Sequence, residues 1–157
     1  MDDVALRMMQ LGARGLCCSQ ILLQLALEMQ GRENPGLVRA MAGLGNGLGD
    51  CSGPCGALSG GACLLGLYAG SALDDAPADP ASERLPLMLA QLEEWFRETV
   101  GQRHGGVSCG EILGDSECGE PDPVLCGSIV GDTFARCLDI LLENGFDPLE
   151  SRDREQT

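Results

Sequence analysis

Apolar side chains recur every three or four residues along most of the chain, with polar residues between them. This period predicts amphipathic helices, and no segment alternates convincingly as a half-buried strand would. Capping residues mark several helix starts: Asp2 or Asp3 before the first helix, Asn34 before Pro35, and Ser108 before a brief helical turn at residues 109–113. We therefore expect helices over about residues 3–12, 16–31, 35–44, 55–73, 81–103 and 126–144.

The fourth of these helices differs from the others, because no residue from Cys51 to Leu73 carries a charge. A stretch of this length is also a candidate transmembrane helix. Its glycine and serine content lowers its hydrophobicity and no basic residues flank it, so we expect a buried central helix instead. The predicted fold class is all-α: a compact single-domain bundle of five to six helices around this Gly-rich helix, covering residues 1–146. Residues 147–157 are expected to form a flexible, charged tail.

The composition supports helices and narrows the range of partners. Aromatic residues make up 3% of the chain, so its 44% hydrophobic content comes mainly from aliphatic residues, Met and Cys, which suit packed helices. Asp and Glu number 24 against 10 for Lys and Arg, which gives a formal net charge of −14. This charge repels phosphate backbones and anionic lipid headgroups, so we expect neither nucleic acid nor a membrane as a partner.

The chain contains 9 cysteines and one histidine. It starts Met1-Asp2-Asp3, without the basic and apolar regions of an export signal, so we expect a cytoplasmic protein whose thiols are kept reduced. Cysteine-rich chains in that compartment are metal-binding, catalytic or redox-sensing more often than disulfide-stapled. His104 is expected to end a helix, and a single histidine excludes zinc sites that need two or three, so a metal site must be nearly all sulfur.

Several cysteines fall in the first turn of a predicted helix, where unpaired N–H groups and the helix dipole favour thiolate over thiol. If these helix ends converge, their sulfurs form a cage for a metal or a set of reactive thiols. Adjacent helical residues point about 100° apart, so only one of Cys17 and Cys18 should face such a site. The cysteines at these starts are Cys17 or Cys18, Cys55, Cys109 and Cys126.

The remaining cysteines are weaker candidates. Cys63 and Cys137 lie about 12 and 16 Å along their helices from Cys55 and Cys126, so we expect both to be small hydrophobic core residues. Cys51 and Cys118 fall in loops before helix-start cysteines. Either could reach the same pocket or be an incidental thiol.

The arrangement of these motifs resembles the C-GCAxxG-C-C family of redox-active proteins over about residues 15–142. The motifs are Cys18-Ser19-Gln20, Cys55-Gly56-Ala57-Leu58-Ser59-Gly60, Cys109 before Glu111-Ile112-Leu113-Gly114, and Cys126 opening the last helix. The resemblance implies a redox role for Cys18, Cys55, Cys109 and Cys126. It also implies a bacterial or archaeal protein, encoded near oxidoreductases or transporters, that holds an iron–sulfur or other prosthetic group. The chain departs from the family in carrying five further cysteines, of which Cys17, Cys51 and Cys118 could enlarge the site.

Glycine is abundant, at 23 residues, without the period of collagen. Gly56 and Gly60 leave the backbone bare at the start of the central helix, so another helix end or a bound cluster could approach closely. We therefore predict that these two glycines adjoin the cofactor.

These observations lead to one expected function and two alternatives. We expect an electron-transfer or redox-sensing protein in which Cys18, Cys55, Cys109 and Cys126 hold an iron–sulfur cluster. The alternatives are a metal-free thiol–disulfide oxidoreductase or switch, and a structural zinc or copper(I) carrier. The expected partner is a redox protein or oxidoreductase, and the small residues of the central helix would also permit a homodimer.

Overall fold

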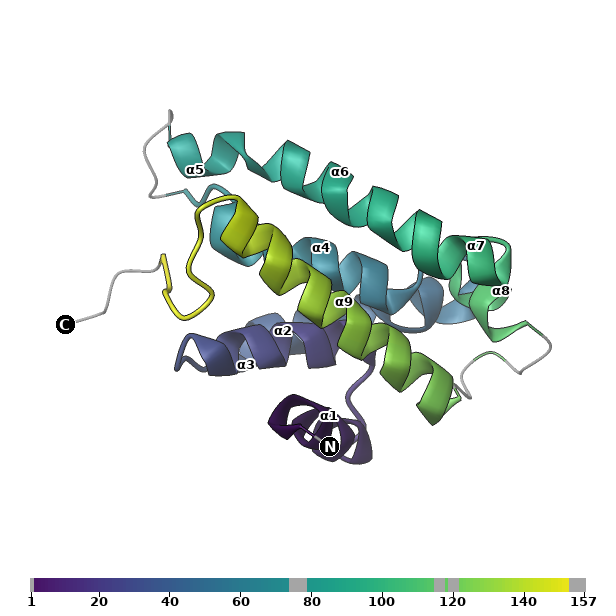
Figure 1. The fold of residues 1–157 in the computed structure, drawn as a ribbon. Helices are drawn as coiled ribbons and strands as arrows, with labels where there is room; N and C mark the ends of the chain where they lie inside the picture. Colours follow the sequence, from purple (N-terminus) through teal and green to yellow (C-terminus); the bar gives the residue numbers. More distant parts are fainter. Residues whose placement is uncertain (1, 74–78, 115–117, 119–121, 153–157) are drawn as a thin grey trace.

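Helix α4 lies at the centre of the molecule, with α2, α6 and α9 packed around it (Figure 1). The computed structural model describes residues 2–73, 79–114, 118 and 122–152. The predicted all-α fold class is confirmed, because the described residues form helices and no strand. The elements are α1 (Asp3–Ala13), α2 (Cys18–Met29), α3 (Pro35–Met41), η1 (Ala42–Leu44), η2 (Gly47–Cys51), α4 (Gly56–Ala69), α5 (Pro80–Glu83), α6 (Leu85–Phe96), η3 (Arg97–Gly101), α7 (Gln102–His104), α8 (Cys109–Leu113) and α9 (Pro123–Glu143).

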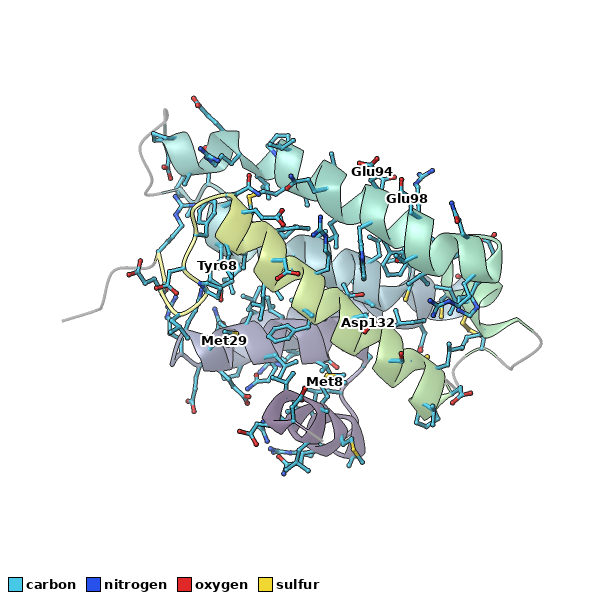
Figure 2. All side chains as sticks on the ribbon, viewed as in Figure 1. Met8, Met29, Tyr68, Glu94, Glu98 and Asp132 are labelled. Atoms are coloured by element: carbon cyan, nitrogen blue, oxygen red, sulfur yellow. A yellow bond between two sulfur atoms is a disulfide. The ribbon has the colours of Figure 1, made fainter. Side chains whose placement is uncertain are left out.

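The uncharged central segment forms α4, which buries Leu64, Leu65 and Tyr68 almost completely. Burial of apolar side chains of this size contributes about 1.5–3 kcal/mol each. Among the described helices, none is long and apolar enough to cross a membrane. The predicted helix 81–103 is a nearly continuous arm made of α5, α6, η3 and α7, and Figure 2 shows Glu94 and Glu98 on its outer face. Arg84, two residues before Pro86, is the residue that separates α5 from α6.

Local capping signals fix most helix starts as predicted. The Asp2 carboxylate accepts the Ala5 N–H at 2.7 Å, and the Asn34 side chain accepts the Leu37 N–H at 3.1 Å. Ser108 and Glu111 form a reciprocal capping box at the start of α8. His104 ends α7, as expected.

The predicted start of the last helix is wrong by three residues. Helix α9 begins at Pro123, with the Asp122 carboxylate accepting the Val124 N–H at 2.9 Å. Asp followed by Pro is the same start signal that Asn34 and Pro35 provide for α3. Cys126 therefore completes the first turn of α9 rather than opening it.

Helices α2 and α4 approach each other closely at Gly60. A Cβ atom on Gly60 would lie 2.7 Å from Cα of Ser19 and 3.2 Å from Cδ1 of Leu22. Only glycine permits this separation, because the nearest atom belongs to the facing backbone and cannot move away independently. The contact fixes the first turn of α2 beside the first turns of α4.

The first part of the C-terminal tail contacts the bundle at Pro148 and Arg152. The Tyr68 hydroxyl donates a hydrogen bond to the Pro148 carbonyl at 2.7 Å. The Arg152 guanidinium pairs with the Asp79 carboxylate and donates to the Gly70 carbonyl. Residues 153–157 lie outside the described part of the chain.

Replacing Gly60 by alanine should destabilise the fold, whereas the same change at Gly66 should not. The new methyl group at Gly60 would overlap the α2 backbone, an overpacking that costs about 1–3 kcal/mol. Gly66 lies on the same helix with nothing within 4 Å of its Cβ position, so Gly66→Ala should stabilise the protein by about 0.5–1 kcal/mol. Urea unfolding followed by circular dichroism measures both changes. Equal stability of the two variants would contradict the close contact.

Candidate functional site

Cys18, Cys55, Cys109 and Cys126 line one small cavity. They come from α2, α4, α8 and α9, whose starts converge there. The cavity volume is about 20 Å³, enough for one water molecule. Its remaining walls are mostly apolar, and the residues described around it include no histidine, aspartate or glutamate: the other lining residues are Asn46, Gly56, Ala57, Ile112, Leu113 and Ile129.

A short backbone pairing brings the starts of α4 and α8 together. The Cys55 N–H donates to the Val107 carbonyl at 2.8 Å, and the Cys109 N–H donates to the Gly53 carbonyl at 3.0 Å. Both bonds involve a cavity cysteine itself, so they fix the positions of Cys55 and Cys109 relative to each other.

The glycine-rich segment before α4 folds over this pairing. Gly47 has φ of 55°, and its Cβ position would lie 2.7 Å from the Gly53 carbonyl oxygen and 2.8 Å from Cβ of Cys109. A side chain at residue 47 would therefore be both strained and in collision with the start of α8. The glycines of this segment allow it to pass directly beside a cavity cysteine.

Only one of the two adjacent cysteines at the start of α2 faces the cavity. Cys18 is the first residue of α2 and lines the cavity, whereas Cys17 is the cap residue before it. The Cys17 sulfur lies 3.3 Å from the Ser19 hydroxyl and against the backbone of Gly45. Because the Ser19 hydroxyl donates its hydrogen to the Met41 carbonyl, the Cys17 thiol is the donor to Ser19.

Cys51 and Cys118 form a disulfide and do not line the cavity. The expectation that the cysteines are reduced thiols is therefore wrong for this pair. The bond joins two residues that lie 67 positions apart in sequence, so no local pattern could have indicated it.

Cys137 lies in the core, as expected, but Cys63 does not. Cys137 is fully buried, its thiol donates to the Gly61 carbonyl, and burial raises its pKa to about 12. Cys63 is exposed, so its predicted core position is wrong. The neighbours of α4 leave one of its faces open, and the uniformly uncharged sequence of α4 gives no sign of which face that is.

The two glycines expected to adjoin a cofactor have different surroundings. Gly56 lines the cavity, and its Cβ position lies 3.4 Å from Cβ of Cys18. Gly60 lies one turn further along α4, at the contact with α2 and outside the cavity lining. Gly60 therefore acts on the site by letting α2 approach.

Burial and mutual repulsion keep most of the cavity cysteines protonated. Burial raises the pKa of Cys55 to about 11, although the Ala57 and Leu58 N–H groups at the start of α4 oppose this shift. Burial, and then the charge of Cys126, raise the pKa of Cys109.

Cys126 is the exception. The Cys18 thiol donates a hydrogen bond to the Cys126 sulfur, which lowers the pKa of Cys126 and raises the pKa of Cys18. A single thiolate, on Cys126, is therefore the first charge that the cavity accommodates.

One comparison with known proteins found a protein family. The model of a protein family described as "Putative redox-active protein (C_GCAxxG_C_C)" matches residues 16–140. That range contains all four cavity cysteines and excludes α1 and the C-terminal tail. The chain belongs to this family. No curated protein and no solved structure matches this chain.

Removing the Cys18 thiol should raise the pKa of Cys126. In reduced, metal-free protein, Cys18→Ala should slow alkylation of Cys126 by iodoacetamide several-fold at pH 7, because each unit of pKa changes the thiolate fraction about ten-fold. Its pH profile should move to higher pH. Cys18→Ser keeps a donor and should retain the low pKa, and Cys17→Ala should behave as wild type. Peptide mapping by mass spectrometry measures each rate, and an unshifted profile in Cys18→Ala would refute the hydrogen bond.

The disulfide should be detectable by counting thiols. Denatured, metal-free protein should show the 7 free cysteines before reduction and all 9 after it. Because the disulfide closes a loop of 67 residues, the double variant Cys51→Ala/Cys118→Ala should lose up to about 4 kcal/mol of unfolding free energy. Nine reactive thiols in the unreduced protein would rule out the Cys51–Cys118 bond.

Proposed function

We propose that this C_GCAxxG_C_C protein carries an iron–sulfur cluster on Cys18, Cys55, Cys109 and Cys126, for electron transfer or redox sensing. The observation that carries the proposal is the convergence of four cysteines, from four separate helix starts, on one cavity with mostly apolar walls. Membership of a redox-active family supports the general class of function, and the chemistry of the cavity supports the choice of cofactor.

The donor set fits a cluster better than a single ion. Soft thiolate ligands select iron–sulfur clusters, zinc or copper(I) over harder metals. A single tetrahedral ion requires its sulfurs within about 4 Å of one another, since each lies about 2.3 Å from the metal. Across the described residues, no three His, Cys, Asp or Glu side chains are arranged to hold one ion. A cluster distributes its thiolate ligands over several irons and tolerates a wider spread.

The protein would contribute charge control and exclusion of water. A bound cluster would supply one-electron transfer. Cluster binding requires the thiols of Cys18, Cys55 and Cys109 to lose their protons. Burial and neighbouring sulfurs oppose this loss, because they raise the pKa of each thiol. Ile112, Leu113 and Ile129 shield the sulfurs from solvent. The cavity is smaller than a cluster, so the four helix starts must also move apart.

One observation favours a second function, metal-free thiol–disulfide exchange. The lowered pKa of Cys126 and its contact with Cys18 are the features of an attacking thiolate and a resolving thiol. The Cys126 thiolate would attack a substrate disulfide and release one substrate thiolate. Cys18, after losing its proton, would then attack the mixed disulfide, which leaves a Cys18–Cys126 disulfide and a fully reduced substrate dithiol.

The partner in either function would be another redox protein. A net charge of −14 makes association with a basic docking surface fast at low salt and disfavours acidic partners.

Metal and sulfide analysis of protein purified without oxygen tests the cluster. Wild-type protein should contain iron and acid-labile sulfide and absorb visible light, and Cys55→Ser should lose most of all three signals. Cys63→Ser is the matched control, because Cys63 lies on the same helix outside the cavity, and it should retain them.

Two other results would decide against the cluster. Colourless, metal-free protein in which mild oxidation links Cys18 to Cys126 would establish the exchange function instead. Iron and sulfide retained equally in Cys55→Ser and Cys63→Ser would place any cluster outside the cavity.

A further inference from the structure

A second and much larger hollow is lined by residues from α1 to α3, and in Figure 1 α2 lies beside both α1 and α3. Its volume is about 530 Å³, within the range of small-molecule sites in proteins. We call it the α1–α3 groove. Its apolar surface comes from Leu11, Leu16, Pro35 and Val38, and polar side chains surround it: Arg7, Arg14, Gln20, Gln24, Glu33, Asn34 and Arg39.

The groove concentrates positive charge in an acidic protein. All 10 basic residues of the chain are arginines, and three of them line this one hollow. Arg7 is already neutralised by the Glu28 carboxylate at 2.6 Å. Arg14 and Arg39 are exposed and make no ion pair within the described residues. Two guanidinium groups are therefore available to a ligand.

We infer that the α1–α3 groove binds a small organic anion with an apolar body. Guanidinium groups bind phosphate and carboxylate through paired, charge-assisted hydrogen bonds, so Arg14 and Arg39 would hold the anionic head. The apolar body would cover Leu11, Leu16 and Val38. The volume of the groove, about 530 Å³, suits a small molecule.

Two further lining residues, Gln20 and Glu33, affect the shape and the charge of the groove. Gln20 accepts the Cys17 N–H at 3.1 Å and donates to the Val38 carbonyl at 3.1 Å, which ties α2 to α3 and fixes one wall. Glu33 places a negative charge in the groove, so it repels the anionic head while offering an acceptor to a ligand hydroxyl.

The groove is independent of the cysteine cavity. The two share no lining residue, and the inference holds whether or not Cys18 and its neighbours bind a cluster.

Phenyl phosphate is a suitable probe, because it joins a phosphate head to an apolar ring. Titration of the full chain by calorimetry at low ionic strength should show saturable binding that weakens as salt is added. Inorganic phosphate and phenol, which each carry half of the probe, should bind more weakly. Arg14→Gln and Arg39→Gln should each weaken phenyl phosphate binding about ten-fold.

Two further variants test whether the effect belongs to the groove. Arg103→Gln removes an exposed arginine of α7 outside the groove and should leave binding unchanged. Glu33→Gln removes the repelling charge and should tighten binding about two-fold. All of these side chains are exposed, so circular dichroism should show wild-type folding for each variant.

The same titrations can overturn the inference. It is wrong if Arg39→Gln and Arg103→Gln weaken binding equally, because the effect would then reflect total charge alone. It is also wrong if phenyl phosphate fails to bind, including the case in which the protein sediments as a dimer with the groove covered by a second copy.

Discussion

The close contact between α2 and α4 at Gly60 is the constraint on which the rest of the structure depends. With no side chain at this position, the backbone of α4 lies against Ser19, and the starts of the two helices are held side by side. Cys18 then faces the start of α4, where Cys55 lies. The pairing of residues 53–55 with 107–109 adds the start of α8, and α9 closes the remaining side. One missing side chain thus determines how closely cysteines from distant parts of the chain approach.

The resulting cavity combines two opposed electrostatic effects. Helix starts provide N–H groups that stabilise thiolates, yet burial and the neighbouring sulfurs oppose ionisation. Burial prevails at Cys55, whose pKa rises to about 11 despite the N–H groups that face it. The cavity can therefore hold one thiolate, on Cys126, but not several without compensation. A cationic metal centre would supply that compensation, and a disulfide would remove the charges altogether.

The sequence predicted the helices well because their signals are local. Asp2, Asn34 and Ser108 each cap a helix through contacts within three residues. The four cysteines that line the cavity are the four that helix starts and family resemblance indicate. Features that depend on distant contacts were missed. The Cys51–Cys118 disulfide and the exposed position of Cys63 follow from tertiary packing, which leaves no trace in nearby residues.

The Cys51–Cys118 disulfide shortens the covalent path between two cavity cysteines, Cys55 and Cys126. Along the backbone, Cys55 and Cys126 are separated by α4, the α5–α7 arm and α8. Through the disulfide, only the short segments 51–55 and 118–126 lie between them. Local opening of the arm therefore leaves both cysteines on a short tether, and their effective concentration stays high. The oxidised protein can lose order over a large part of its chain while Cys55 and Cys126 remain near each other.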